Sequence, residues 1–406
     1  MKERPQPIER KLVTPGVLVL LALIGIGVVV AGYRFLFGLS AVTNLDQQHP
    51  WGLWIAIDVA TGVALAAGGF TTAALAHVFH RHHYDAIVRP ALLTAMLGYT
   101  FVGIGLMADL GRYYNIWHPA WPTMWQGNSV LFEVGMCVMC YLTVLYIEFL
   151  PIVCERFMTD ERRPRLARMC AGVHRLVNKT MFVFILAGVV LSCLHQSSLG
   201  TLMVIAPSKM HALWYTPILP LLFLLSAIAV GYPMVVVESL YASWSLGLEP
   251  ERRVLSGLAR IIPVLLGLYL AFKLADLVIR EAYAEAFDGS VQAGMFLVEM
   301  LVGLIIPFAM LLSERVRRTP GLLLIAALSI VLGVALNRVN VFLVAYQPPY
   351  AVRSYFPSPG EFAVTIGLVA LLILCYRVIV TCLPVISAPA PRPGRSGRVF
   401  GRPNAA

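Results

Sequence analysis

The chain alternates long apolar runs with short polar connections from residue 15 to residue 384. A run of 18 or more apolar residues is long enough to cross the hydrocarbon core of a bilayer as a helix. Strands of a membrane barrel would alternate apolar and polar positions over about ten residues, and these runs do not. We therefore predict an all-α integral membrane protein with ten transmembrane helices. The spans are expected at 15–39, 51–79, 86–110, 128–153, 179–205, 216–241, 254–279, 290–313, 319–346 and 359–384.

The composition agrees with a chain that is mostly membrane. Charged residues make up 13% of its 406 positions and hydrophobic residues 59%, whereas soluble domains are about 25% charged. Residues 1–385 are predicted to form one membrane domain. The Pro-, Arg- and Gly-rich segment 386–406 is predicted to be a disordered cytoplasmic tail. The longest connections, 154–179 and 111–127, are expected to be loops, so an electron-carrying group must lie among the helices or in a partner protein.

The net charge of +10 does not indicate nucleic-acid binding, because the bases gather in alternate connections. That distribution follows the positive-inside rule, which places both termini in the cytoplasm. The first apolar run is too long for the core of a signal peptide and is better read as the first span. The bases concentrate in 2–11, 81–89, 156–179, 252–253, 315–318 and 392–402.

Three acids lie near the outer ends of predicted spans. In this topology Asp58 is about 10 Å deep in span two and Glu133 about 8 Å deep in span four, while Asp109 ends span three. His195 lies about 15 Å from the outer end of span five. Ionisable side chains within a bilayer are costly and usually functional. The sequence therefore predicts a site for protons or a polar ligand among spans two to five.

Other polar positions in the spans leave two interpretations open. Glu133, Tyr141 and Glu148 recur along span four, either as a polar seam between helices or as a proton route. Lys273 and Asp276 are spaced to pair with each other. Glu238, Glu299 and Arg377 are weaker evidence, since they can pair with neighbours or extend to the interface. Cys137 and Cys140 are interpreted as packing residues, and none of the seven cysteines implies a disulfide framework.

The residue pattern also limits which cofactors this chain is expected to hold. No two histidines of the spans fall at matching depth on different helices, so we predict no haem in this subunit. No dinucleotide fingerprint, phosphate-binding loop or zinc ligand set is present, and no metal site is predicted. A quinone fits what remains, because its tail is soluble in lipid and its head takes up two protons on reduction.

Several short motifs in order resemble the NrfD/PsrC family of quinone-interacting membrane subunits. Within it they are most similar to the HybB type, the membrane subunits of hydrogenase-2-type nickel–iron hydrogenases. The resemblance covers about residues 30–385. One departure is Pro359-Gly360, where the family tends to carry Trp before the acid at Glu361. The motifs are 50–58 (PWGLWIAID), 111–115 (GRYYN), 128–133 (NSVLFE), 195–200 (HQSSLG) and 355–358 (YFPS).

The resemblance implies a subunit of the bacterial inner membrane that binds menaquinone or ubiquinone near the outer face. It implies electrons from a periplasmic, ferredoxin-like iron–sulfur subunit, connected to the large and small subunits of a nickel–iron hydrogenase. It also implies that this subunit holds no haem. The family's pocket acids correspond to Asp58 and Glu133, and its His-Gln-Ser-Ser stretch begins at His195.

Our hypothesis is quinone reduction between spans two to five. Asp58 or His195 would hydrogen-bond a quinone oxygen beside Tyr99, and Glu133 would relay protons that travel along Tyr141 and Glu148. The outer rim of the pocket is assigned to Asp109 and Arg112. The same quinone role with a molybdoenzyme, multihaem cytochrome or sulfur-oxidising complex is the nearest alternative. A proton-coupled transporter should show internal repeats, and none is evident. A purely structural anchor would leave the outer acids unexplained.

Overall fold

The computed structural model describes residues 7–8, 12–81, 84–158 and 162–386. All but the first residue of the predicted disordered tail, 386–406, lies outside these ranges. The prediction of ten spans is confirmed, because within these ranges ten helical segments are long and apolar enough to cross a membrane. They are α1 (Pro15–Phe37), Trp54–Val78, α4 (Asp85–Asp109), α5 (Val130–Phe157), α6 (Pro164–Val204), α7 (Leu219–Leu246), α8 (Arg252–Ile279), Val291–Leu312, Pro320–Val344 and α13 (Pro359–Cys382).

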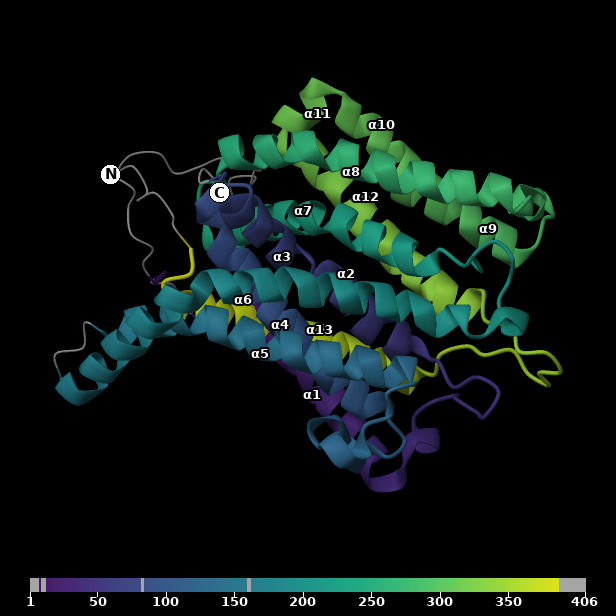
Figure 1. Cartoon of the computed structure of the whole chain (residues 1–406), viewed down its shortest axis with the longest axis horizontal. Coiled ribbons are helices and arrows are strands. Elements are labelled where there is room, and N and C mark those ends of the chain that lie inside the picture. Colours follow the sequence, from purple (N-terminus) through teal and green to yellow (C-terminus); the bar gives the residue numbers. More distant parts are fainter. Residues whose placement is uncertain (1–6, 9–11, 82–83, 159–161, 387–406) are drawn as a thin grey trace, which may run out of the picture.

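The spans run side by side and change direction at each connection (Figure 1). We call the end where α1 begins and α13 ends the proximal end, and the opposite end the distal end. These correspond to the predicted cytoplasmic and outer faces. The second span is largely buried, whereas α1 is mostly exposed on the surface of the bundle. Gly27 of α1 lies against Gly367 of α13 so closely that a Cβ on Gly27 would stand 2.9 Å from the Gly367 Cα.

The expected loop at 154–179 is mostly helix, which corrects the prediction. Helix α6 is 41 residues long, or about 61 Å, twice the thickness of the hydrocarbon core. Together with the end of α5 it projects past the proximal end of the bundle (Figure 1). The basic residues in the first part of α6 interrupt the apolar pattern of the sequence. They do not interrupt the helix, because Arg, Leu, Ala and Met all favour helix. Pro164 suits the first helical position, so the helix starts well before the membrane.

Three spans contain π-helical stretches that the sequence pattern did not predict. Span two consists of η2 (Trp54–Thr61), α2 (Gly62–Leu65), α3 (Gly68–Ala73) and η3 (Ala74–Val78). Span eight consists of α9 (Val291–Val298), η10 (Glu299–Ile305) and α10 (Ile306–Leu312). Span nine consists of α12 (Pro320–Val339) and η11 (Asn340–Val344), and the short α11 (Glu314–Arg318) precedes it. π-Turns are often found at functional sites, and these bring Asp58, Glu299 and Asn340 into the bundle.

Candidate functional site

Asp58 lies in η2, where the second span packs between α4 and α13. The Thr365 hydroxyl of α13 donates a hydrogen bond of 2.7 Å to Asp58 Oδ2. Gly105 of α4 makes room for the acid, because a Cβ there would stand 2.8 Å from the Asp58 Cβ. The acid therefore points into a close-packed helix junction, as predicted. Its hydrogen-bond partner comes from α13, a helix that the prediction did not include in the site.

Asp109 and Arg34 meet at the distal end of α4. Arg34 Nε donates to the Ala108 carbonyl at 2.6 Å, and its Nη2 donates to the Leu110 carbonyl. A cation at a helix C-terminus is stabilised by the unpaired carbonyls there. The Asp109 carboxyl lies within electrostatic reach of Arg34, Glu361 and Asp58, and its buried Oδ1 has no hydrogen-bond partner. Sequence reasoning missed Arg34, although it is the one base inside the first apolar run.

Glu361, in the first turn of α13, organises the distal connections around this cluster. It accepts backbone N–H bonds from Asn44 at 3.0 Å and Ser358 at 3.1 Å, and it also accepts the Tyr355 hydroxyl. Ser358 and Glu361 form a capping box, which satisfies the free N–H groups at the start of the helix. Burial and the neighbouring Glu361 carboxyl raise the pKa of Tyr355. Pro359 and Gly360, which depart from the family pattern, thus form the start of α13 and leave the hydrogen bonds of Glu361 in place.

A second polar group lies deeper in the bundle, where Tyr99 of α4 meets His195 of α6. The Tyr99 hydroxyl is 2.7 Å from His195 Nε2, and His195 Nδ1 is 3.2 Å from the Leu191 carbonyl. Because a carbonyl only accepts, Nδ1 carries the hydrogen and the neutral ring accepts from Tyr99 through Nε2. The Tyr141 ring stands edge-on to Tyr99 at 4.6 Å. All three side chains are buried.

The structure separates the members of the predicted proton path. Glu133 is exposed on the surface of α5, and its Oε1 accepts a 2.6 Å hydrogen bond from Ser198. Tyr141 and Glu148 are buried. Eight residues of α-helix leave Glu133 about 80° around the axis from Tyr141, so the three do not share one face. Arg112 lies exposed in the distal loop rather than on the rim of a closed pocket.

The predicted residues therefore fall into separate groups. Asp58 and Asp109 lie together with Arg34 and Glu361, whereas Tyr99 and His195 form a pair. Both groups include α4, on which Tyr99 and Asp109 are ten residues or about 15 Å apart. The distal group depends on α1 and α13, so spans two to five alone do not build the site.

An apolar groove runs beside the distal acids on the outside of the bundle. It has a volume of about 620 Å³ and lies between α1 and α13. Phe362 and Ile366 of α13 line it, while Thr365 on the same helix turns to Asp58. Asn44 also lines the groove, and its backbone N–H bonds to Glu361. The groove is thus separated from the acids by little more than one helix.

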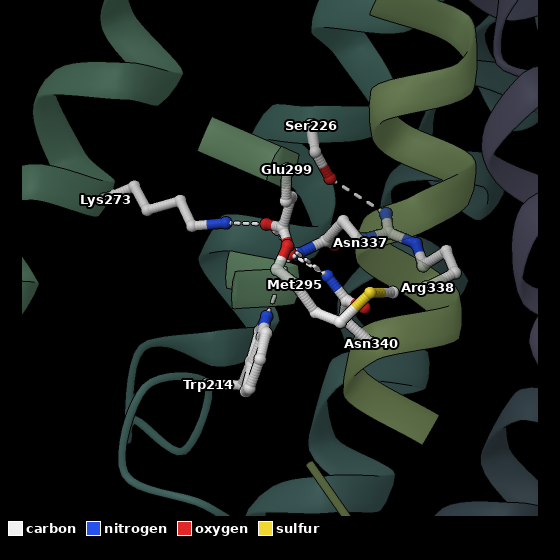
Figure 2. A network of polar contacts seen from close by, with 8 residues as sticks. All are labelled: Trp214, Ser226, Lys273, Met295, Glu299, Asn337, Arg338 and Asn340. Carbon is white, nitrogen blue, oxygen red and sulfur yellow. Dashed lines mark hydrogen bonds and ion pairs between the residues drawn. The ribbon is translucent and has the colours of Figure 1, made fainter. Parts of the chain in front are cut away.

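A further polar centre, which the sequence analysis did not assign to a site, lies among α7, α8, η10 and α12 (Figure 2). Glu299 Oε1 accepts from Lys273 and from Asn337 Nδ2 at 2.8 Å. Its Oε2 accepts from Trp214 Nε1 at 2.9 Å and Asn340 Nδ2 at 2.8 Å. Lys273 thus pairs with Glu299 and not with Asp276.

Arg338 lies beside this centre, with its guanidinium 3.7 Å above the centroid of the Phe223 ring. Asp276 instead binds Arg280 at 2.8 Å. The expected i, i+3 pairing failed because η10 presents a carboxylate deeper in the bundle.

Comparison with known proteins gives the chain's relatives. The family model described as "Polysulphide reductase, NrfD" matches residues 41–349. The "Probable Ni/Fe-hydrogenase 2 b-type cytochrome subunit" of Escherichia coli is 35% identical, covering 95% of this chain and 96% of that protein. The "Menaquinone reductase, integral membrane subunit" of Nitratidesulfovibrio vulgaris is 26% identical, with 89% of each chain covered. A subunit of the selenate reductase of Mesobacillus selenatarsenatis is 21% identical, covering 89% of this chain and 92% of that protein.

The prediction that this subunit holds no haem is wrong, because the Escherichia coli relative is named as a b-type cytochrome subunit. A haem iron is held by side chains such as His or Met. Among the described residues, the histidine deep in the bundle is His195, and both of its ring nitrogens face protein partners. In this arrangement His195 does not fit as an axial ligand.

Proposed function

Because this chain belongs to the NrfD family of membrane subunits, we propose that it is the quinone-reducing subunit of a respiratory complex. Electrons would come from a periplasmic nickel–iron hydrogenase through an iron–sulfur protein, and menaquinone or ubiquinone would be the acceptor. The observation that carries the proposal is the pair of distal acids, Asp58 and Asp109, beside an apolar groove at the same end of α13.

The chemistry explains why these two features belong together. Reduction of a quinone to a quinol consumes two electrons and two protons, so a quinone site needs side chains that can supply protons. The isoprenoid tail needs a lipid-facing surface such as the groove lined by Phe362 and Ile366. Asp58 holds one hydrogen bond and Asp109 has an unpartnered oxygen, so both keep capacity to bind or release a proton.

The Tyr99–His195 pair supports a second part of the proposal. A neutral imidazole that accepts from a phenol can take up a proton and pass one on without moving far. Tyr141 and Glu148, buried nearby on α5, stay candidates for the proton path. Glu133 is exposed beside Ser198, so its predicted relay role would operate from the surface of α5.

The distal loop 111–127 supports docking of an electron-donating partner at this end. It is built from short 3₁₀ turns, and Trp117, Trp121 and Trp125 are exposed on it. Exposed aromatic residues are frequent in protein interfaces, and they also form belts at the membrane surface.

The test begins with purification of the full chain in mild detergent. Mass spectrometry of the preparation should detect a quinone, an iron–sulfur subunit and nickel–iron hydrogenase subunits. In that complex, Asp58→Asn should lower hydrogen-dependent quinone reduction by about 10²-fold, because it removes a proton-exchanging group and keeps its shape. Thr365→Val, which removes only the hydrogen bond to Asp58, should have a smaller effect. Normal quinone reduction by Asp58→Asn would remove Asp58 from the mechanism.

A second candidate keeps the quinone and changes the electron donor. Relatives named as subunits of a menaquinone reductase and a selenate reductase favour it. A preparation that contains a molybdoenzyme or a multihaem cytochrome in place of hydrogenase subunits would establish this alternative.

A further inference from the structure

A cavity opens at the proximal end of the bundle, far from the distal acids. It lies between the start of α4, the last turns of α7 and the end of α13, and its volume is about 50 Å³. A buried water needs about 10–15 Å³ measured in this way, so the cavity has room for a few water molecules. Its polar lining includes Glu238, Glu249, Glu251 and Tyr376.

Glu238 lies at the inner end of this cavity. The Tyr376 hydroxyl donates to Glu238 Oε1 at 2.8 Å, whereas the buried Oε2 has no hydrogen-bond partner. The Thr94 hydroxyl lies beside the carboxyl but outside hydrogen-bond geometry, and it too is unpartnered. Buried polar atoms are nearly always bonded to protein or to ordered water. A carboxyl oxygen left open beside a cavity of this size therefore indicates bound water.

The mouth of the cavity is acidic. Glu249 is exposed and Glu251 is half-buried in the connection between α7 and α8, and burial raises the pKa of Glu251. On the opposite wall, Pro90 of α4 cannot donate to the Ala86 carbonyl one turn earlier, and both residues line the cavity. The carboxyls of Glu249 and Glu251 thus stand opposite a backbone oxygen that can bind water.

The cavity lies on the proximal side of the Tyr99–His195 pair. Glu238 lies eight residues from the end of α7, about 12 Å deep, and Thr94 lies at a similar depth on α4. Tyr99 follows five residues later on α4, about 7.5 Å further along the axis. The Thr72 hydroxyl, also buried and unpartnered, belongs to α3, which packs against both α4 and α7. The unpartnered hydroxyls of Thr72 and Thr94 therefore lie at about the depth of Glu238, on helices that pack beside it.

We propose that this cavity is a proton inlet in which Glu238 takes up protons from the proximal solution through water and passes them toward Tyr99 and His195. Glu249 and Glu251 collect protons at the mouth. Each proton that leaves Glu238 is replaced from solution, so the residue is unchanged over a turnover that consumes two protons and two electrons. The transfer of protons from Glu238 to Tyr99 and His195 rests on the proposed quinone reduction, whereas the existence of a water-filled inlet does not. The route is distinct from the predicted path along α5.

The inlet is tested first without turnover. The infrared carboxyl band that disappears in Glu238→Gln identifies this side chain in the full chain purified with its partner subunits. Transfer to D₂O should shift that band at once in the native protein. In Ser239→Leu, which fills the cavity, the shift should slow at least about tenfold, and Ser239→Ala should exchange like the native protein. A band that does not shift in D₂O would overturn the inlet.

The rate of quinone reduction tests whether protons from the inlet reach Tyr99 and His195. Glu238→Gln should lower quinone reduction by about 10²-fold, and Ser239→Leu should lower it at least about tenfold with Glu238 intact. Ser239→Ala serves as the matched control. Normal quinone reduction in both Glu238→Gln and Ser239→Leu would overturn the proposal. A native complex that exchanges the Glu238 band but reduces no quinone would refute the proposed function and leave the inlet standing.

Discussion

Two carboxylates in π-helical segments of this protein, the buried Glu299 and the half-buried Asp58, have opposite surroundings. Glu299, in the second half of the chain, receives two donors on each oxygen, one of them the Lys273 ammonium (Figure 2). Asp58, in the first half, receives one hydroxyl, and neighbouring Asp109 has an oxygen with no partner. A saturated carboxylate has no lone pair free for a proton, whereas an under-satisfied one does.

The difference shows that a π-helix does not by itself mark a reactive acid. In both regions it brings a polar residue into the bundle, but the neighbouring helices decide what that residue does. Four donors, one of them the Lys273 ammonium, make Glu299 a brace between α8, η10 and α12, a network that is stable only when complete. Asp58 packs closely against Gly105 and accepts from a single threonine, which leaves its carboxyl with capacity for a further partner.

The largest expected loss of stability comes from removing the Glu299 carboxylate, which holds α8, η10 and α12 together. Glu299→Gln leaves Lys273 buried without a counter-charge, and removal of one partner of a buried pair costs about 3–5 kcal/mol. Thermal unfolding of the purified complex should show this loss. The double variant Lys273→Met/Glu299→Leu should recover part of it, because Lys273 is then no longer a buried charge without a partner. Unchanged unfolding in Glu299→Gln would show that the network does not stabilise the fold.

Tyr99→Phe should have a smaller effect on stability and a clear effect on activity. It leaves His195 Nε2 buried without its donor, which costs about 1–3 kcal/mol. Quinone reduction should fall, since the proposed proton carrier loses its neighbour. Tyr146→Phe removes an exposed hydroxyl from α5, keeps the Tyr99–His195 hydrogen bond and is the matched control. Equal rates in native protein and Tyr99→Phe would exclude the pair from proton transfer.

Gly105→Ala tests how Asp58 is positioned without changing its chemistry. The added Cβ would stand 2.8 Å from the Asp58 Cβ, and such overpacking costs about 1–3 kcal/mol. We expect unfolding at lower temperature and slower quinone reduction. Gly103→Ala, whose Cβ would meet no atom within 4 Å, should behave like the native protein. Matching behaviour of the two variants would contradict the close packing of Asp58.

The smallest expected change in stability is that of Glu133→Gln. Glu133 is exposed and an amide oxygen can still accept from Ser198, so unfolding should change by less than about 0.5 kcal/mol. Its predicted relay role requires a slower rate of quinone reduction with assembly intact. A normal rate would take Glu133 out of the proton path.

The sequence by itself determined the ten spans and their order, because membrane-length apolar runs have few alternatives in a bilayer. It also singled out Asp58, Tyr99 and His195, since polar groups in hydrocarbon are costly enough to be conspicuous. Its helical pattern placed Asp58 on a packed face, but it assumed regular α-helix throughout. The apolar pattern did not reveal the full length of α6, because basic residues end an apolar run in the sequence without ending the helix.

Only the tertiary structure decided which of these residues meet. Thr365 and Glu361 lie some 300 positions from Asp58 in the numbering and reach its surroundings because α13 packs beside η2. The pairing of Lys273 with Glu299 depends on a π-turn whose register no local pattern reveals. Whether a buried acid is saturated or open is set by side chains from several helices at once, and that is a property of packing rather than of sequence.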